Sequence, residues 1–399
     1  MSKSISYVLV TPYTIAKSRT GGVLSRLLSR TDLSLVGAQM FAPDKQFAMD
    51  YAASLRSRAP SNQLMLLADY AEKNIAPSGG RPHRTLLLLF SGENPCEQLL
   101  NVCGHIYTQH VEVDALSGET IRDTYSDLIF SPDNPNEVRY FEPAVFTPRH
   151  QNEANGDLKF IADFLEKQNN IVQNIKYPDP SKIERTLVII KPDNWTHNSS
   201  RPGTIIDMFS RTGLRIIGIK IHRFSLAEAL DFYGPVEAVL KEKLAVSYGK
   251  KAQELLEKEF GFKLSAKLSN LLHTDLGYEC AQNQFHQIIN FISGKWPDSN
   301  SGDPEKEGDI KCMIMVYEGE NAINKIRDVL GPTDPLKAPE GTVRREFGSN
   351  VMVNTAHASD STESYEREKK IVRIDNNSVV SIIREHINCK IDNAQRSLL

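Results

Sequence analysis

Residues 185–191 read Arg-Thr-Leu-Val-Ile-Ile-Lys, and residues 312–317 read Cys-Met-Ile-Met-Val-Tyr. Both runs are short, apolar and rich in residues that favour strands, and Pro192 closes the first of them. Between them, Ile205, Ile206 and Phe209 recur at helical spacing. These runs predict buried strands that are separated by an amphipathic helix.

The order of the predicted elements narrows the fold. A helix that contains Ile205 to Phe209 and ends near Gly213 is followed by a strand at 214–221. The strand at 312–317 is followed by a helix at 320–330. The resulting β-α-β-β-α-β order is typical of the α+β class and predicts a ferredoxin-like sandwich, an antiparallel sheet with helices on one face.

The chain repeats this pattern, because residues 7–40 echo residues 187–221. The matched glycine pairs are Gly22 with Gly203, Gly37 with Gly218, Gly92 with Gly319 and Gly104 with Gly331. The first two pairs differ by 181 positions and the last two by 227. Two shared offsets predict two copies of one module in tandem, and the growth in offset predicts an insertion in the second copy.

The predicted domain organisation follows from the repeat. The first copy spans 1–150, a helical connector spans 151–183, and the second copy spans 184–372 with an insertion at about 235–283. The insertion is rich in Lys, Glu and Leu and predicts helices, punctuated by Gly249 and Gly261. The extension 373–399 carries an apolar stripe that predicts a docking helix, formed by Val379, Val380, Ile382, Ile383 and Ile387.

Composition excludes several functional classes. Of 399 residues, 40% are hydrophobic and 24% charged, and the net charge is −3, which argues against a general nucleic-acid or membrane-surface binder. No apolar run approaches the ~20 residues of a membrane span. The N-terminus lacks the apolar core of a signal peptide. Five scattered cysteines favour reduced thiols, so we expect a cytoplasmic protein without a cysteine metal site.

The stretch Asn354-Thr-Ala-His357-Ala-Ser359-Asp360-Ser361 carries the strongest chemical signal. Neutral imidazole is a good nucleophile near pH 7, because its ordinary pKa is about 6.5. A histidine that attacks phosphorus also needs an acceptor to fix its tautomer and cations to neutralise phosphoryl oxygens. The candidates for these two roles are Ser359, Glu366 or Glu368, and Arg327, Arg344 and Lys191.

This stretch resembles the N-x-x-H-G-S-D-S signature of nucleoside diphosphate kinases. Other segments resemble the same family in the same order. These are Arg185 to Asp193, Gly319-Glu-Asn321, Gly331-Pro-Thr333-Asp-Pro335 and Gly341-Thr-Val-Arg344. The likeness covers roughly residues 183–235 and 284–372. It implies the same ferredoxin-like fold that the element order predicts.

The resemblance implies a role for each matching residue. His357 would be the phosphorylated nucleophile, which Glu368 and Ser359 orient, and Asn354 would contact the ribose. Asp360 would lie near the Mg²⁺–phosphate end of the site. Val351 and Phe285 would flank the base. The nucleotide phosphates would be held by Lys191, Arg327, Thr333 and Arg344.

Two positions depart from the family pattern. Ala358 replaces the glycine after the histidine, and if the backbone there needs a positive φ, alanine costs ~1–2 kcal/mol. The paired phenylalanines of the family appear here as Gln284-Phe285, close to the insertion.

The first copy lacks most of the chemistry. Thr11, Leu100 and Ile106 stand where the second copy has its lysine, first arginine and threonine, whereas Arg122 matches Arg344. The counterpart of His357 is predicted to be Arg139 or Ala144. A single cation would hold a γ-phosphate poorly, so 1–150 is expected to be non-catalytic.

The expected function is therefore a Mg²⁺-dependent nucleoside diphosphate kinase that uses nucleoside triphosphates and diphosphates. The alternative is a non-catalytic or slow nucleotide-binding regulator or scaffold. A phosphatase would need a residue that positions water, and the sequence offers no candidate. Neither a membrane nor a specific nucleic acid is expected as a partner. By analogy with the family, the chain forms a homo-oligomer or pairs its two copies as an intramolecular pseudo-dimer.

Overall fold

The computed structural model describes residues 3–396 apart from 59–60, 107–116, 299–301 and 377. Its residues group into two compact units. The larger unit comprises Met1–Ile221, Met313–Glu366 and Arg373–Leu399, and the smaller comprises His222–Cys312 and Arg367–Val372. The ends of the predicted segments 1–150 and 373–399 include residues that lie outside the described part of the chain.

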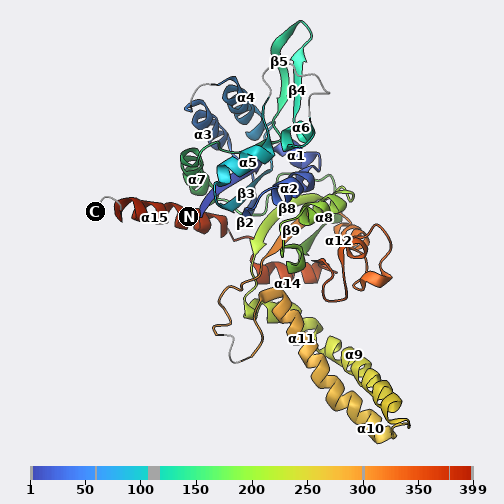
Figure 1. The fold of residues 1–399 in the computed structure, drawn as a ribbon. Coiled ribbons are helices and arrows are strands. Elements are labelled where there is room, and N and C mark those ends of the chain that lie inside the picture. Colours follow the sequence, from blue (N-terminus) through green and yellow to red (C-terminus); the bar gives the residue numbers. More distant parts are fainter. Residues whose placement is uncertain (1–2, 59–60, 107–116, 299–301, 377, 397–399) are drawn as a thin grey trace. The chain divides into compact units, whose positions relative to one another are not determined.

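The larger unit contains two four-stranded sheets (Figure 1). The first has the order β2-β3-β1-β6, and the second has the order β10-β7-β9-β8. Strand β1 pairs antiparallel with β3 and β6, and β7 pairs antiparallel with β9 and β10. The strands of the first sheet are β1 (Ser4–Val10), β2 (Ser34–Phe41), β3 (Thr85–Gly92) and β6 (Val145–Phe146). Those of the second are β7 (Ile183–Ile190), β8 (Arg215–His222), β9 (Cys312–Glu320) and β10 (Ala356–Ala358).

The strands of the first sheet are apolar on both faces, and the alternation of side chains divides them between two cores. Val8 and Val10 belong to one core, and Tyr7 and Leu9 belong to the other. Because side chains point to alternate sides of a strand, a run with no polar alternation must be covered on both faces.

Helices supply both covers. Helix α2 (Thr20–Ser29) and helix α5 (Pro95–Cys103) contribute to the first core. The second core contains residues of α3 (Lys45–Arg56), α4 (Asn62–Tyr70), α7 (Gln151–Leu165) and α15 (Ser378–Arg396). The prediction that helices cover only one face of the sheet is therefore wrong for this sheet. Segment 151–165 covers the sheet as well as connecting the two halves.

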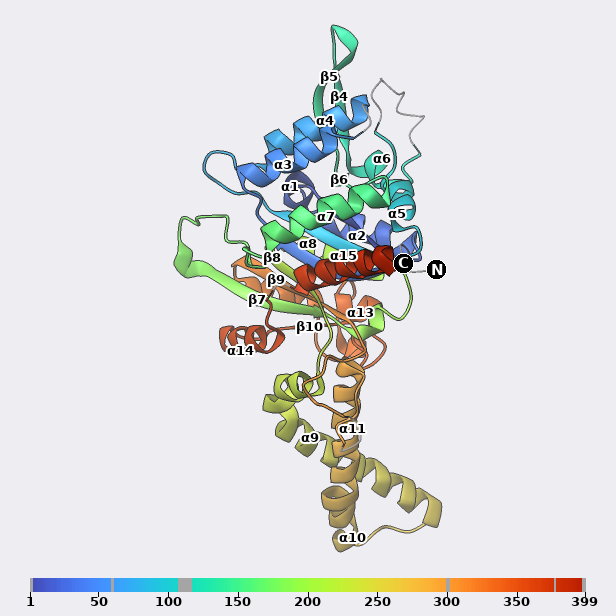
Figure 2. The same ribbon diagram turned by 90° about the vertical axis from the view of Figure 1, so that its left-hand side faces the viewer.

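The C-terminal stripe forms part of this second core. Val379 and Ile383 are buried in it, and Val380, Ile382 and Ile387 pack against it. Arg384 forms ion pairs with Asp163 of α7 at 2.6 Å and with Glu166, the residue that follows α7, at 3.3 Å. The predicted helix of the extension is present, and Figure 2 shows it beside α7.

The central strands pair in the same register in both sheets. Ser4 faces Gly92 in the first sheet, and Glu184 faces Gly319 in the second, so the offsets are 180 (184 − 4) and 227 (319 − 92). The same offsets hold at the other ends of the strands, where Val10 faces Leu86 and Ile190 faces Met313. The second sheet carries α8 (Arg201–Ser210) and α12 (Ala322–Leu330) in the places that α2 and α5 occupy in the first.

The smaller unit is largely helical. Helix α9 (Leu226–Phe260) lies beside α11 (Gly277–Ser293), joined through α10 (Ala266–Leu271) and η5 (Leu272–Leu276). The Ser225–Glu228 capping box opens α9, and Gly261 ends it with φ +74°. Gly249 was predicted to break this segment, which is wrong. It lies inside α9, where a Cβ would come within 2.3 Å of the His273 ring, so the glycine permits close helix packing.

The remaining elements are short. They are α1 (Pro12–Ala16), η1 (Ala71–Ile75), α6 (Ile121–Tyr125), β4 (Asp127–Ser131), β5 (Asn134–Glu142), η3 (Pro180–Lys182), η4 (Pro192–Asn194), η6 (Pro335–Lys337), α13 (Val343–Phe347) and α14 (Thr362–Val372). Within the described residues, no helix is both long and apolar enough to cross a membrane.

Candidate active site

The candidate nucleophile lies on a short edge strand. His357 is the middle residue of β10 and pairs with Ile189 of β7. The next residue after β7 is buried Lys191, whose backbone N–H donates to Thr355 O (2.9 Å). The sheet register therefore brings the predicted lysine and the predicted histidine strand together, although 166 positions (357 − 191) separate the two residues in sequence.

Asn354 connects the predicted phosphate residues. Its Oδ1 accepts a hydrogen bond from Lys191 Nζ at 2.7 Å. Its Nδ2 donates to Thr333 O at 3.1 Å and to Val351 O at 2.8 Å. The buried amide thus joins three segments, whereas the predicted role was a contact to ribose. Val351 itself is 56% exposed and is free of any core role.

Arg344 braces the same loops. Its Nη1 donates to Gly331 O and its Nη2 donates to Ala356 O, both at 3.0 Å. Ala356 precedes His357, so the guanidinium fixes the start of the histidine strand. The predicted contact of Arg344 with phosphate would come in addition to this bracing.

Arg327 and Asp360 are two residues of opposite charge in the neighbourhood of the histidine. Both are exposed. The Ser364 hydroxyl, which donates to Asp360 Oδ1 at 2.6 Å, lowers the pKa of that carboxyl, and the charges of Arg327 and His357 lower it further. Asp360 is therefore ionised at neutral pH and sits in the electrostatic field of both residues.

Thr355 holds the strand in a strained conformation. Its φ is +75°, which is an outlier for a β-branched residue. Its Oγ1 accepts from Arg201 Nη2 at 2.8 Å and donates to Asp193 Oδ2 at 3.5 Å. Arg201 also pairs with Asp193 at 3.2 Å. Burial raises the pKa of Asp193, and the charges of Arg201 and Lys191 offset part of that increase.

Sequence reasoning assigned no role to Thr355, Asp193 or Arg201. The only signal was the position of Asp193, two residues after Lys191. A positive φ at a threonine leaves no trace in composition or periodicity.

The hydroxyl of Ser359 faces the central strand. Ser359 is fully buried, and its Oγ accepts from Leu187 N at 3.3 Å. Ala358 lies in β10 and is not among the residues with positive φ. The condition under which Ala358 would be strained, a positive φ, is therefore not met, and the residue with positive φ is Thr355, three positions earlier.

Two predicted residues belong to the smaller unit. Glu368 is buried in α14, and its role in orienting the histidine stays a prediction. Phe285 is 1% exposed inside α11, with Lys241 Nζ 5.1 Å from its ring centroid. A ring that stacks on a base needs an open face, so the burial of Phe285 argues against base stacking, and that role stays a prediction.

The first half shows the same framework with different side chains. Arg122 donates to Gly104 O and to Val145 O, as Arg344 does to Gly331 O and Ala356 O. Thr11 N donates to Ala144 O, as Lys191 N does to Thr355 O, and Ala144 also has a positive φ, +62°. These matches align Val145 with Ala356. The counterpart of His357 is consequently Phe146, and both Arg139 and Ala144 were wrong.

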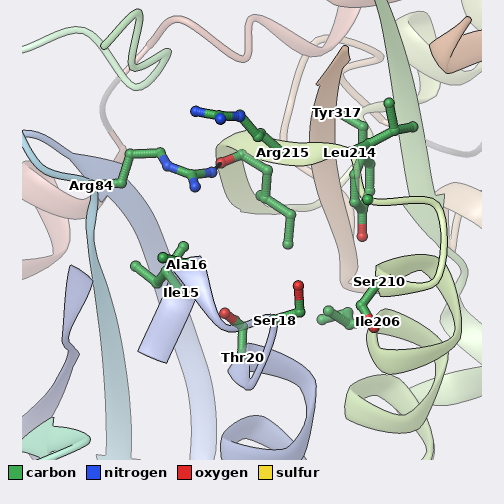
Figure 3. A pocket seen from close by; sticks show the side chains of 12 residues that line it. Ile15, Ala16, Ser18, Thr20, Arg84, Ile206, Ser210, Leu214, Arg215 and Tyr317 are labelled. Atoms are coloured by element: carbon green, nitrogen blue, oxygen red, sulfur yellow. Dashed lines mark hydrogen bonds between the residues drawn. The ribbon is translucent and has the colours of Figure 1, made fainter. Parts of the chain in front are cut away.

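One cavity contains none of the predicted residues. Figure 3 shows this space, of about 210 Å³, with Arg84 and Arg215 opposite the hydroxyls of Ser18 and Thr20. Arg84 Nη1 donates to Ile216 O at 2.6 Å. Burial and the nearby Arg215 lower the pKa of Arg84 to about 10. None of the residues that line this cavity belongs to the histidine strand β10.

Metal binding by protein groups alone is not supported. Across the described part of the chain, no three His, Cys, Asp or Glu residues gather in a way that could hold an ion. A single ionised carboxylate such as Asp360 still suits Mg²⁺, which commonly takes one or two carboxylates together with substrate phosphates.

Comparison with known proteins identifies the class. The family model described as nucleoside diphosphate kinase matches residues 307–376. A nucleoside diphosphate kinase of Halorhodospira halophila is 30% identical over 186 residues, which is 47% of this chain and 89% of that relative. One of Anaeromyxobacter is 32% identical over 181 residues, 45% of this chain and 83% of the relative. A solved NDP kinase from Pyrobaculum aerophilum is 28% identical and covers 47% of this chain and 94% of its own, with a TM-score of 0.33.

Because the chain covers most of these relatives at 30% identity or more, it belongs to the nucleoside diphosphate kinase family. The resemblance stated from the sequence is confirmed.

Proposed function

We propose that the chain is a nucleoside diphosphate kinase that moves the γ-phosphate of a nucleoside triphosphate to a nucleoside diphosphate through phosphorylated His357. The observation that carries the proposal is the network of Lys191, Asn354 and Arg344 around β10. That network holds the histidine strand and the loop of Thr333 together, with the charges of Arg327 and Asp360 nearby.

The reaction proceeds in two half-steps. A ring nitrogen of neutral His357 attacks the γ-phosphorus, a nitrogen–phosphorus bond forms, and the bond to the β-phosphate oxygen breaks. The diphosphate leaves with that electron pair. A second diphosphate then attacks the phosphohistidine with a terminal oxygen, and the imidazole leaves as the neutral base. One site that serves both halves predicts ping-pong kinetics.

The cations stabilise charge as it develops. Lys191 and Arg344 are already fixed by hydrogen bonds, so little reorganisation is needed when a polyphosphate binds. Exposed Arg327 can swing toward the phosphate. When Mg²⁺ is bound, it neutralises charge on the phosphate oxygens, and Asp360 is the residue that would hold it.

We also propose that the two halves are tandem copies of one module. The non-catalytic copy would span 1–150, a connector would span 151–183, and the catalytic copy would span 184–372. The shared strand register and the replacement of His357 by Phe146 support this division. Pairing of the copies within one chain would give a pseudo-dimer, and further self-association remains part of the proposal.

The alternative function is a slow nucleotide-binding regulator. The burial of Phe285 favours it, because the base would lack one stacking partner. The presence of the histidine together with its fixed cations favours the kinase, because a binder has no need of a nucleophile.

The deciding experiment follows phosphate from γ-labelled ATP with Mg²⁺. We expect an acid-labile, base-stable label on the chain, which transfers to added GDP. His357→Asn should lose the label while binding nucleotide, and His150→Asn, which changes an exposed histidine of the first half, should keep it. Nucleotide binding without any label on the natural chain would reject the kinase in favour of the regulator.

A further inference from the structure

The first half retains a cavity at the place where its sister half carries the catalytic histidine. The cavity measures about 230 Å³, and Gly104, Arg122 and Phe146 are among the residues that line it. The hydrogen-bond matches described above align these residues with Gly331, Arg344 and His357. Loss of the nucleophile has therefore not closed the space.

Arg122 makes the cavity electrostatically unusual. It is 4% exposed, and its two described acceptors are neutral backbone carbonyls, Gly104 O and Val145 O. Its Nε is buried and finds no hydrogen-bond partner among the described residues. A buried guanidinium without a carboxylate costs free energy, which a bound anion would recover.

The other two arginines of the cavity already have carboxylate partners. Arg58 pairs with Glu153 at 3.2 Å and also pairs with Asp157. Arg149 Nε lies 3.9 Å from Glu153 and, like Arg122 Nε, has no described hydrogen-bond partner. Among the described residues, three guanidinium groups thus face two carboxylates, which leaves one positive charge to be matched, and His105 also lines the cavity.

Much of the remaining lining is apolar. Leu55, Leu64, Leu67, Ile106 and Phe146 contribute to it. Ile106 and Leu100 stand where the second half has Thr333 and Arg327, so the groups that suit a polyphosphate are absent. A triphosphate would bring several negative charges to a site with one positive charge in excess.

We infer that this cavity binds a compact organic anion, one carboxylate or phosphate-monoester group on an apolar body, with the anionic group at Arg122 and Arg149. The bound group would match the positive charge that the described carboxylates leave over. Its apolar body would pack against the leucine side chains of the lining. This site is distinct from that of the proposed kinase reaction and does not depend on it.

The test measures binding by calorimetry to the full chain in the presence of saturating Mg·ADP. The probes are benzoate, phenyl phosphate, inorganic phosphate and neutral benzyl alcohol. We expect saturable binding of benzoate or phenyl phosphate with a Kd of about 1 mM or tighter. The tighter of the two identifies the anionic group. Inorganic phosphate and benzyl alcohol should each bind at least about tenfold more weakly, because the first has no apolar body and the second has no anionic group.

Two variants locate the site. Leu100→Trp narrows the cavity from a half-buried position and should abolish binding, whereas Leu255→Trp, at an exposed leucine of α9, should not. Arg149→Gln should weaken the anion about tenfold without changing benzyl alcohol. Thermal unfolding of each variant checks that it is folded.

Four outcomes would overturn the inference. The first is that no probe binds saturably up to about 10 mM, and the second is that benzyl alcohol binds as tightly as the anions. The third is that Leu100→Trp leaves binding unchanged, and the fourth is that binding appears only without Mg·ADP, which would assign the probe to the nucleotide site. Failure of the phosphohistidine experiment affects none of these readouts.

Discussion

At the scale of single residues, the site depends on the backbone conformation of Thr355, which a β-branched side chain disfavours. Thr355 has φ +75°, and such an outlier costs of order 1–3 kcal/mol unless the surroundings hold it. Arg201 and Asp193 hold it through the hydroxyl, and Lys191 N holds it through the carbonyl. The strain therefore sits two residues before the candidate nucleophile.

Thr355→Val should separate the hydroxyl from the shape of the side chain. It keeps the β-branch but removes one hydrogen-bond partner from Arg201 and one from Asp193, which still pair with each other. We therefore expect a loss of ~1 kcal/mol in the free energy of unfolding. Turnover should fall more than nucleotide affinity, because β10 carries His357. Urea unfolding and steady-state kinetics measure the two effects. Thr355→Ser keeps the hydroxyl and should stay close to the natural chain. Equal loss in both variants would contradict the explanation.

Ala358→Gly tests the departure from the family signature. Because Ala358 is in a strand without positive φ, glycine relieves no strain and adds backbone entropy to the unfolded state. We expect the free energy of unfolding to fall by ~0.5–1 kcal/mol, with activity unchanged. An increase in stability measured by chemical denaturation would show that strain at this position had been missed.

The sequence predicted the site unevenly. Each of the predicted residues Lys191, Asn354, Arg344 and Thr333 lies in a motif. In the structure Asn354 bonds to Lys191 and to Thr333 O, and Arg344 bonds to Ala356 O, two residues after Asn354. Phe285 could not be judged, because its burial depends on the packing of α9 and α11. Phe146 was missed because its place follows from strand register, which no spacing in the poorly matching region 126–150 reveals.

At the scale of elements, strands were more predictable than helix packing. Runs such as Leu187 to Ile190 are apolar throughout, and their short length, β-branched residues and the proline that follows favour buried strands. Helix α7 was assigned to a connector because the spacing of its apolar residues predicts a helix but not the surface against which that helix packs. The structure places Leu158, Ile161 and Leu165 in the core beneath it.

Gly156 of α7 and Gly249 of α9 provide a matched pair inside helices. Gly156 is exposed, and a Cβ there would meet no atom within 4 Å, so Gly156→Ala should stabilise α7 by up to ~1 kcal/mol, because alanine is the better helix former. Gly249→Ala has the same intrinsic gain, but its Cβ would lie 2.6 Å from His273 Cα and 2.7 Å from Leu272 O. We therefore expect net destabilisation of ~1–3 kcal/mol, as for overpacked cores. Hydrogen exchange along α7 for the first variant, and along α9 and α11 for the second, measures the difference. Equal effects of the two substitutions would contradict the packing explanation.

At the scale of the larger unit, the two halves meet through α2 and α8. A Cβ on Gly21 would lie 2.4 Å from Gly203 O, and one on Gly203 would lie 2.3 Å from Gly21 O. The first core runs across both halves, with Leu24 and Leu27 on one side and Ile205 and Phe209 on the other. The repeat predicted the halves, but their joint core could not be read from either half alone.

Asp207 gives this junction a pH dependence. Burial raises the pKa of Asp207, and a hydrogen bond from Gly22 N–H opposes that shift. A raised carboxyl pKa means that the folded state favours the protonated form, so the charge costs stability above the folded pKa and costs nothing below the unfolded value of ~3.9.

Asp207→Asn should therefore raise the melting temperature at pH 8, and the gain should shrink as the pH falls through the raised pKa toward 4. Exposed Asp32→Asn is the control and should show no such trend. Thermal scans between pH 4 and pH 8 measure the effect. A gain that is the same at every pH would mean that burial of the charge is not its source.

The return of α15 to the first sheet has a consequence for synthesis on the ribosome. Tyr7 and Leu9 emerge early, yet Val379 and Ile383, which share their core, are added more than 360 residues later. At ~5–20 residues per second, that face of the sheet waits some tens of seconds for its final cover. During that interval the nascent chain exposes an apolar surface, which makes it a natural client for chaperones that bind at the exit tunnel.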